Sequence, residues 1–315
     1  MTIALVTGGA GFIGSHIVER LVAEQYQVRV VDNLCTGNLE NLSHVSSAIE
    51  FFQCDINDTD TLEEAMNGVQ VVFHQAALAS VPLSVEKPHE VNQACVNGTL
   101  NVLNVAKNQG VKKLVYAASS SCYGNNPYAA KRETDTLMTL SPYAAAKLAG
   151  EFYCQSFFHS FGLETVGIRY FNVFGPRQDP DSPYSAVIPL FITWMLNGVS
   201  PTVYGDGLQS RDFTFVQNVV DANLLAATTD GIGGRVFNAA NGKSVDLLTL
   251  IQLLNKYLGT QIDPVHREPR VGDVRESLAD INSAMKELGY EPRVGFEDGL
   301  KRSIDYYRNL VKQTI

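Results

Sequence analysis

The chain has 315 residues, of which 45% are hydrophobic and 18% charged, so it can bury a large core in one or two domains and is not expected to be disordered. Its 24 Lys and Arg against 33 Asp and Glu give a net charge of -9, which argues against nucleic acid or a membrane surface as a partner. The longest apolar stretch, Ala186 to Leu196, is far shorter than the roughly 20 residues of a membrane-spanning helix. The first residues carry no basic region typical of a signal peptide, so we expect a cytoplasmic protein.

Strands alternating with helices are predicted over the first half of the chain. Runs rich in β-branched residues predict strands at Ile3 to Thr7, Val28 to Asp32, Ile49 to Gln53, Val69 to His74, Lys113 to Ala118 and Glu164 to Arg169. Helical patterns lie between them at Phe12 to Glu24, Asp60 to Met66, Pro88 to Asn108 and Pro142 to Phe161. This alternation predicts an α/β fold with a Rossmann-like, doubly wound parallel sheet, which binds ligands at the carboxyl ends of its strands.

Gly and Pro become frequent after Asn172, and this change predicts a second, smaller part of the chain. A short strand is expected there at Thr202 to Tyr204, and helices at Val219 to Thr228, Leu247 to Leu258, Ile281 to Leu288 and Phe296 to Lys312. We therefore predict a first domain over residues 1–172 and a smaller α/β C-terminal domain over residues 173–315, some segments of which return to the first. A ligand is expected between the two.

No metal site is expected from the cysteines and histidines. The five cysteines contain no CxxC pair, and the six histidines contain no HExxH pair. We expect the cysteines to be reduced and buried.

The first predicted strand leads into a glycine-rich turn, Thr7-Gly8-Gly9-Ala10-Gly11-Phe12-Ile13-Gly14, that opens a helix. Such glycines allow the sharp turn and the close approach of the backbone to a pyrophosphate, while the helix N-terminus contributes N–H groups and the positive end of its dipole. Asp32 follows at the end of the second strand, at the spacing of about 20 residues typical of a carboxylate that binds the adenosine ribose. No arginine is adjacent to Asp32, which favours NAD over NADP.

Tyr143 and Lys147 lie four residues apart in a predicted helix and therefore on one of its faces. An ordinary tyrosine has a pKa of about 10, so forming its phenolate near pH 7 costs roughly 4 kcal/mol, which a nearby Lys cation offsets in part. The pattern alone is more often an exposed helix face. The serines Ser119 to Ser121, just past a predicted strand, place hydroxyls at the same edge of the sheet and make alcohol and carbonyl chemistry the better interpretation.

These residues belong to a series of motifs in the order of a known family. They are TGGAGFIG at Thr7, Asp55-Ile56, HQAA at His74, NGT at Asn97, SSSCYG at Ser119, YAAAK at Tyr143, YFNVFGPRQDP at Tyr170, YGDG at Tyr204, SRDF at Ser210 and REPRVGDVRESLADI at Arg267. Over essentially its whole length the sequence resembles the extended short-chain dehydrogenase/reductase family, and within it the 4-epimerases of UDP-glucose and UDP-N-acetylglucosamine.

The resemblance implies NAD-dependent 4-epimerisation of a UDP-hexose through a transient 4-keto sugar. Tyr143, polarised by Lys147, would remove the proton of the 4-hydroxyl while hydride passes from C4 to NAD, and the keto sugar would turn over and be reduced on its other face. The implied catalytic residues are Ser119, Ser121, Tyr143 and Lys147. The implied NAD contacts are Gly8, Gly11, Phe12, Ile13, Gly14, Asp32, Asn33, Asp55, Ile56, Gln75, Ala76, Ala77, Asn97, Tyr143, Lys147 and Tyr170.

The resemblance also implies a nucleotide-sugar site and a homodimer. The substrate contacts it implies are Ser80, Ser119, Ser121, Asn172, Val187, Tyr204, Arg211, Arg270, Asp273 and Ser277. Family members commonly dimerise through two helices, which here would be Pro88 to Asn108 and Pro142 to Phe161.

Departures from the family pattern narrow the activity. Dehydratases of the family carry Asp-Glu where this chain has Ser120 and Ser121, so loss of water is disfavoured. The Ala79 to Pro82 loop resembles that of members acting on N-acetylated sugars, and Ser277 stands where members of narrow specificity place a tyrosine. Two alternatives stay open, namely a uronic-acid epimerase, decarboxylase or reductase of the same fold, and a non-catalytic NAD-sensing regulator.

Overall fold

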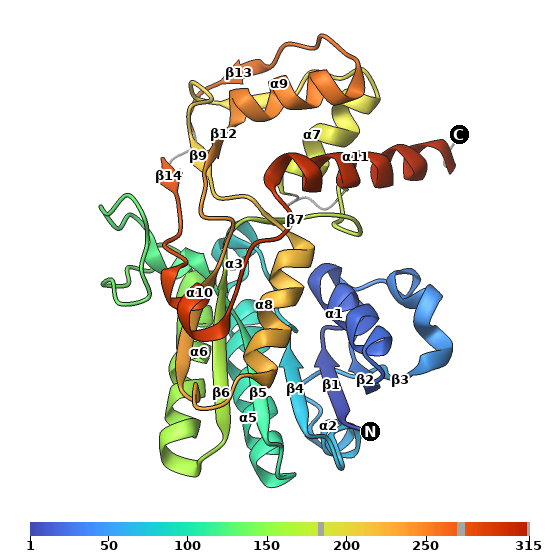
Figure 1. The fold of residues 1–315 in the computed structure, drawn as a ribbon, viewed down its shortest axis with the longest axis vertical. Coiled ribbons are helices and arrows are strands. Elements are labelled where there is room, and N and C mark those ends of the chain that lie inside the picture. Colours follow the sequence, from blue (N-terminus) through green and yellow to red (C-terminus); the bar gives the residue numbers. More distant parts are fainter. Residues whose placement is uncertain (182–185, 270–274, 314–315) are drawn as a thin grey trace.

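A seven-stranded parallel sheet forms the centre of the structure, a computed structural model that describes residues 1–181, 186–269 and 275–313 (Figure 1). Its order is β11-β6-β5-β4-β1-β2-β3, and every pairing is parallel. The strands are β1 (Ile3–Thr7), β2 (Gln27–Val31), β3 (Ile49–Phe52), β4 (Val71–His74), β5 (Lys113–Ser119), β6 (Glu164–Tyr170) and β11 (Arg235–Ala239). Strand order reverses beside β1, which lies between β2 and β4, and doubly wound sheets bind ligands at such a point.

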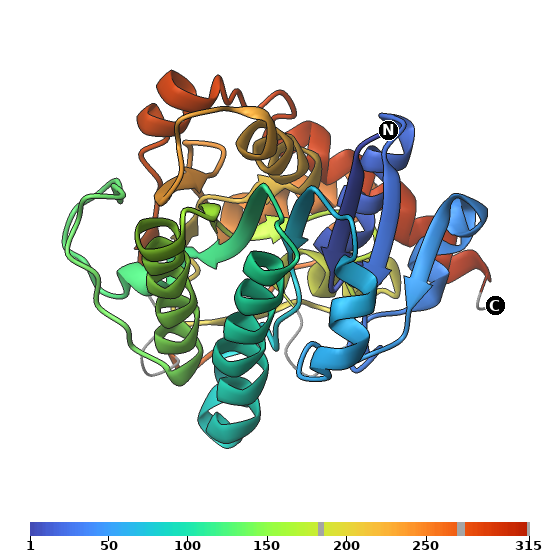
Figure 2. The ribbon, with the colours of Figure 1, turned by 90° about the horizontal axis from the view of Figure 1, so that it is seen from below.

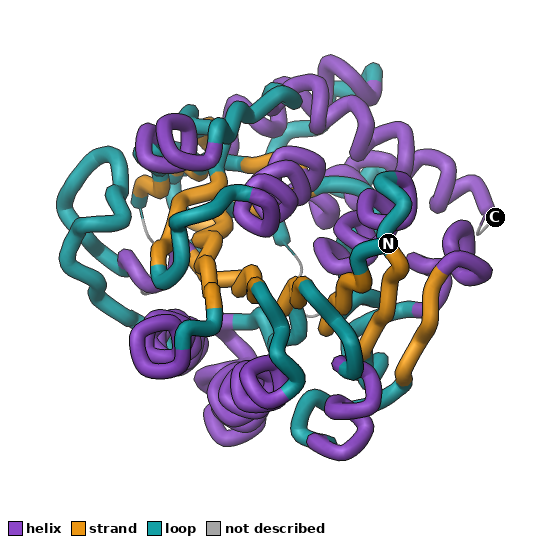
Figure 3. Tube along the Cα trace, turned by 60° about the horizontal axis from the view of Figure 1, so that its bottom comes forward, coloured by secondary structure: helices purple, strands orange, loops and turns teal. Residues whose placement is uncertain are grey.

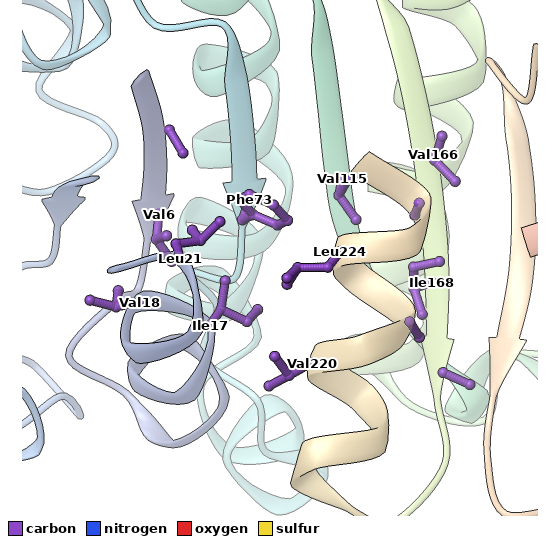
Figure 4. Close-up of a cluster of buried hydrophobic side chains, with 14 of the residues drawn as sticks. Val6, Ile17, Val18, Leu21, Phe73, Val115, Val166, Ile168, Val220 and Leu224 are labelled. Atoms are coloured by element: carbon purple, nitrogen blue, oxygen red, sulfur yellow. The ribbon is translucent and has the colours of Figure 1, made fainter. Parts of the chain in front are cut away.

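Helices cover both faces of this sheet (Figure 2). One face carries α1 (Phe12–Ala23), α8 (Val216–Thr228) and α10 (Asn282–Leu288). The other carries α2 (Thr59–Met66), α4 (Pro88–Asn92), the π-helical turn η2 (Gln93–Asn97), α5 (Gly98–Asn108) and α6 (Pro142–Phe161). Because successive strand residues point to opposite faces, Leu5 and Val6 belong to different hydrophobic clusters. Figure 4 shows the cluster of Val6, in which Ile17 of α1 approaches Val220 and Leu224 of α8.

A smaller part of the chain lies above the sheet in Figure 1 and has its own core. Its short strands form three sheets, β7 (Val173–Phe174) with β10 (Thr214–Phe215), β12 (Val245–Asp246) with β9 (Ser210–Arg211) and β14 (Glu276–Ser277), and β8 (Thr202–Tyr204) with β13 (Val265–Arg267). Its helices are α7 (Val187–Leu196), α9 (Leu247–Leu258) and α11 (Phe296–Gln313). Phe174 meets Phe296 edge to face at 5.6 Å between ring centroids, and these rings help to join the short strands to α11.

Three short helical segments complete the described elements. They are η1 (Leu39–Ala48), α3 (Val81–Glu86) and η3 (Ser120–Tyr123). Figure 3 shows how much of the chain between the helices and strands is loop.

The α/β, Rossmann-like fold predicted from the sequence is confirmed, and several predicted elements coincide with observed ones. Strand Thr202–Tyr204 and helices Pro142–Phe161 and Leu247–Leu258 have the predicted bounds. The helix predicted from Pro88 to Asn108 contains the π-helical turn η2. Most short strands of the smaller part and the short helical segments had no prediction. Nor did two larger elements: α7, which occupies the longest apolar stretch, and β11, which joins the large sheet from beyond residue 172.

Candidate active site

One cavity of about 1000 Å³ opens at the carboxyl ends of the central strands, beneath the smaller part of the chain. It brings together residues that the sequence analysis assigned to cofactor, catalysis and substrate. Its lining includes Gly8, Gly11, Phe12, Ile13, Gly14, Asp32, Asn33, Asp55, Ile56, Gln75, Ala76, Ala77, Ser80, Ser119, Ser121, Tyr143, Lys147, Tyr170, Asn172, Arg211 and Ser277. The cavity therefore runs from the glycine-rich turn to the short strands β9 and β14.

The glycine-rich turn is shaped for a phosphate group. Gly8 has a φ of +67°, and a Cβ on it would lie 2.7 Å from the backbone nitrogen of Ala76. A Cβ on Gly14 would lie 2.1 Å from the Gly8 carbonyl oxygen, so only glycine allows α1 to begin this close to β1. Gly11 caps α1, and the first N–H groups and positive dipole end of this helix would attract an anion bound at the turn. The turn thus fits a dinucleotide pyrophosphate.

Asp32 lies at the end of β2, where its buried carboxylate also holds the surrounding loops. It accepts backbone hydrogen bonds from Ala10 (2.9 Å) and Leu34 (2.8 Å), and a Cβ on Gly37 would lie 2.8 Å from it. The Asp32 carboxylate is therefore fixed at the cavity wall, at the end of the second strand of a doubly wound sheet, where such a carboxylate can accept from a ribose diol.

Asp55 and Asn33 form a polar pair beside Asp32, with 2.7 Å between the Asn33 amide nitrogen and the Asp55 carboxylate. Burial raises the pKa of Asp55, but hydrogen bonds from Asn57 and Asn33 outweigh it and hold that pKa below its ordinary value. Asp55 is thus an ionised acceptor in the cavity wall.

Tyr143 and Lys147 are one turn apart at the start of α6, and both line the cavity. The helix begins here because the Ser141 hydroxyl accepts the backbone N–H of Ala144 at 3.1 Å. Tyr116 of β5 supports α6 from below and donates to the Lys147 carbonyl at 3.1 Å. Gly150 is required at this crossing, since a Cβ there would lie 2.3 Å from the Tyr116 hydroxyl.

The two titratable groups have pKa values shifted in opposite directions. Burial raises the pKa of Tyr143, although a hydrogen bond with Ser119 lowers it in part. Burial lowers the pKa of Lys147, while Cys95, Cys154 and Glu151 raise it. Desolvation thus disfavours the charged form of each group, the Tyr143 phenolate and the Lys147 ammonium, and moves their two pKa values apart. Such opposite shifts at neighbouring groups in a cavity are typical of a functional site.

Ser119 and Ser121 add two hydroxyls at the end of β5, with 2.8 Å between their Oγ atoms. The backbone N–H of Ser121 donates to Ser119 Oγ at 3.2 Å, which fixes the Ser119 side chain at the start of η3. Ser119 therefore links Ser121 to Tyr143 in one hydrogen-bonded group.

The opposite wall is built by the smaller part of the chain. Arg211 of β9 is paired in register with Ser277 of β14, and both line the cavity. The Asn172 amide nitrogen lies 3.5 Å from the Ser277 hydroxyl. This wall places a guanidinium and small polar groups opposite the tyrosine and serines of α6 and β5.

Some predicted site residues lie elsewhere. Val187 begins α7 and packs against the core of the smaller part, and Tyr204 pairs with Arg267 between β8 and β13, so neither lines the cavity. Asn97 is an exposed residue that donates to Gln93 at 2.6 Å, and packing in η2 keeps it away from the cavity. Arg270 and Asp273 lie outside the described residues.

A hydrogen-bonded chain behind the glycine-rich turn was not predicted. The Thr99 hydroxyl donates its hydrogen to the Cys95 carbonyl at 2.7 Å. Thr99 must therefore accept from His74 Nε2, at 3.0 Å. In a neutral ring the other nitrogen, His74 Nδ1, then accepts from the Thr7 hydroxyl at 2.7 Å. Burial, and then Lys147, lowers the pKa of His74 to about 3, which keeps the ring neutral. The HQAA and NGT motifs contain His74 and Thr99, but their pairing across the sheet has no signal in the sequence.

A second unpredicted group supports the floor of the cavity. The Tyr170 hydroxyl lies 2.9 Å from Gln75 Oε1 and 3.0 Å from Asn223 Oδ1. Asn223 belongs to α8 and is fully buried, so the later part of the chain supports a cavity residue from beneath.

Neither a metal cluster nor a membrane span is found in the described part of the chain. No group of three His, Cys, Asp or Glu side chains within these ranges could hold a metal ion. No helix of the described ranges is long and apolar enough to cross a bilayer.

Comparison with known proteins agrees with this geometry. The NAD dependent epimerase/dehydratase family matches residues 4–240. A putative UDP-glucose 4-epimerase of Methanocaldococcus jannaschii is 38% identical over 97% of this chain and 98% of its own length. A UDP-glucuronate 4-epimerase of Thermodesulfobacterium geofontis is 33% identical over 98% of this chain and 97% of its own.

Solved structures are also similar over nearly the whole chain. A UDP-N-acetylglucosamine 4-epimerase from Methanobrevibacter ruminantium, in complex with UDP-N-acetylmuramic acid, has a TM-score of 0.94 and 41% identity, covering 98% of this chain and 99% of that one. A UDP-glucose 4-epimerase from Thermus thermophilus in complex with NAD has a TM-score of 0.90 and 36% identity, covering 98% and 99%.

Proposed function

Because the chain belongs to the NAD dependent epimerase/dehydratase family and its cofactor is NAD, we propose that it catalyses 4-epimerisation of UDP-hexoses, including N-acetylhexosamines. The observation that carries the proposal is that Ser119, Tyr143 and Lys147 line the same cavity as the glycine-rich turn. A protein that only sensed NAD would not require these three side chains, which argues against the regulator alternative.

Tyr143 is proposed as the acid and base of the reaction. It takes the proton of the sugar 4-hydroxyl as C4 is oxidised and returns it when the 4-keto sugar is reduced. The chemistry that NAD supplies when bound is reversible acceptance of a hydride from C4. Lys147 favours the Tyr143 phenolate through its positive charge, which counters the rise in pKa that burial causes.

Ser119 and Ser121 are proposed to hold the reacting oxygen. Their hydroxyls are already joined to one another, and Ser119 to Tyr143, so the 4-oxygen can exchange its proton along a preformed hydrogen-bonded group. The 4-keto sugar must then turn over so that its other face meets the cofactor. The cavity of about 1000 Å³ between the catalytic residues and the wall of β9 and β14 leaves room for this rotation.

The uridine diphosphate is assigned to the wall of the smaller part. Arg211 offers a planar set of donors suited to phosphate oxygens, and Asn172 offers an amide. Ser80, which caps α3 by accepting the Leu83 N–H at 3.1 Å, lines the same cavity nearer the sugar. In this acidic protein, Arg211 gives the dianion a local positive charge.

Acceptance of N-acetylated sugars rests on Ser277. Its side chain is half-buried at the cavity wall, and a small residue there leaves volume beside the sugar. A larger side chain at this position would fill the space that an N-acetyl group needs.

The test is NMR of the purified protein incubated separately with UDP-N-acetylglucosamine, UDP-glucose and UDP-glucuronic acid. Interconversion at C4 of the first two sugars is expected. Conversion of UDP-glucuronic acid alone, or loss of carbon dioxide from it, would instead favour the uronic-acid alternatives, and no conversion of any of the three would contradict the proposal.

A homodimer is also proposed. The helices α4 to α5 and α6 are neighbours, and α6 exposes 52% of Phe152 and 57% of Phe161 to solvent. A second copy covering these rings would remove apolar surface from water. Light scattering is expected to give twice the chain mass, and Phe152→Glu is expected to shift it toward the monomer.

A further inference from the structure

Asp212, in the SRDF motif, is a fully buried carboxylate that accepts three backbone N–H groups. One oxygen accepts from Asn241 at 2.8 Å, and the other from Gly242 at 3.0 Å and from Ala279 at 3.3 Å. Burial raises the pKa of Asp212 to about 6, against the opposing effect of these hydrogen bonds. Keeping this group ionised at neutral pH therefore has an energetic cost, and hydrophobic packing alone does not explain its presence.

The three N–H groups come from segments that are far apart in the chain. Asn241 and Gly242 follow β11 of the large sheet, whereas Ala279 follows β14 of the smaller part. Asp212 itself follows Arg211 of β9, and its backbone N–H donates to the Ser277 carbonyl at 2.7 Å. One carboxylate thus ties the large sheet to both strands of the substrate wall.

We propose that Asp212 is the positioning residue of this wall, and that its carboxylate sets the separation and orientation of Arg211 and Ser277 for a uridine diphosphate sugar. That the ligand is a uridine diphosphate sugar rests on the proposed function. The catalytic groups lie on β5 and α6, across the cavity, and do not touch Asp212. Its loss is therefore expected to weaken substrate binding without slowing the chemical step.

Asp212→Asn is the direct variant because it keeps the size of the side chain. It replaces one acceptor oxygen by an NH2 group, which faces backbone N–H groups and cannot accept from them. Asp246→Asn is the matched control. Asp246 lies on the neighbouring strand β12, accepts from the backbone N–H of Thr249 at 2.7 Å and does not line the cavity.

The probes are UDP in a calorimetric titration and UDP-N-acetylglucosamine in kinetics. Asp212→Asn is expected to raise the Kd of UDP and the KM of the sugar nucleotide by roughly tenfold, with kcat and bound NAD within about twofold of wild type. Asp246→Asn is expected to lower Tm and leave Kd and KM unchanged. An unchanged KM in Asp212→Asn, an equal loss in kcat, or similar behaviour of the two variants would overturn the proposal.

The wild-type protein provides a measurement that does not depend on the folding of a variant. Added UDP should slow backbone hydrogen exchange in residues 241–242 and 277–279 together, with one dependence on UDP concentration. Protection of only one segment would overturn the role of Asp212. A protein that binds UDP but converts no sugar contradicts the proposed function alone, whereas failure to bind UDP overturns both.

Discussion

The ammonium nitrogen of Lys147 lies 4.3 Å from the centroid of the Tyr116 ring, over its face. The hydroxyl of the same tyrosine donates a hydrogen bond to the Lys147 carbonyl. Tyr116 of β5 therefore contacts both the main chain and the ammonium group of Lys147. Attraction between the cation and the ring offsets part of the cost of burying the ammonium group. This contact therefore helps the buried Lys147 side chain to stay charged one helical turn from Tyr143.

Tyr143→Phe removes the acid and base hydroxyl and keeps the ring. We expect kcat to fall by roughly 10²- to 10⁴-fold, with the NAD content of the purified protein unchanged. Lys147→Met should act similarly, because it removes the charge that favours the phenolate. Steady-state kinetics and cofactor analysis check both, and near-normal turnover of Tyr143→Phe would rule out the proposed role.

NAD that is regenerated in each cycle has no need to leave the protein. Acid denaturation of the purified protein should therefore release NAD in near-equal amount to chain, with none added beforehand. Chromatography of the supernatant provides the measurement. Release of NADP, or a requirement for a continuous supply of external reductant, would contradict the cycle.

Gly14→Ala should disrupt the phosphate end of the cofactor site. The added Cβ would lie 2.1 Å from the Gly8 carbonyl oxygen, so α1 or the turn must shift. Overpacking of this kind costs about 1 to 3 kcal/mol, and bound NAD should fall with Tm. Gly295→Ala is the control, because a Cβ at that position meets open space. This variant should keep the bound NAD and the Tm of the wild type.

Ser277→Tyr should separate the two classes of sugar. A phenol ring in the wall would compete with an N-acetyl group for space, at a cost of roughly tenfold or more in kcat/KM. Turnover of UDP-N-acetylglucosamine should fall, and that of UDP-glucose should be spared or improve. An equal loss on both substrates, or no loss on either, would remove Ser277 as the determinant of specificity.

His16 should make stability depend on pH. Its Nδ1 accepts from Arg177 at 2.6 Å and its Nε2 donates to the Pro176 carbonyl at 3.0 Å, so the ring is neutral. Burial and Arg177 lower the pKa of His16 from 6.5 to about 4. The unfolded chain therefore takes up this proton first as the pH falls. The stability contributed by His16 is fully present above pH 6.5 and is lost toward pH 4, at about 1.4 kcal/mol per pH unit within that window.

Urea unfolding at several pH values measures this effect. The free energy of unfolding of wild type minus that of His16→Gln should shrink as the pH falls from 6.5 to 4. His159→Gln, at an exposed position on α6, should keep the wild-type slope. A difference that stays constant with pH would show that His16 does not titrate in this way.

Local signals explain which elements could be predicted from the sequence. The bounds of α6 follow from the Ser141 cap, Pro142 and the left-handed Gly162, and those of α9 from the Asp246 cap and Gly259. Each signal lies within or next to the helix that it delimits.

Long-range packing explains what the sequence did not reveal. Strand β11 is short and contains Asn238, a polar residue that is buried only because Tyr123 and backbone groups from distant segments bond to it. The cofactor end of the cavity was predictable because one turn and one strand end build it. Tyr204 was assigned to the substrate wall from its motif, but its position depends on pairing with β13.

Strand β11 also determines when the sheet can form during synthesis. Until residues 235–239 have been made, β6 has only β5 as a neighbour, and its other edge presents unpaired N–H and C=O groups. At an earlier stage, before residues 216–228 have been made, the nascent chain also lacks Val220 and Leu224 of α8, so the apolar side of α1 and the central strands is open to water (Figure 4). The seven-stranded sheet that carries Ser119 can therefore be completed only after the later residues leave the ribosome. Until then the open edge of β6 is a surface on which another chain could pair.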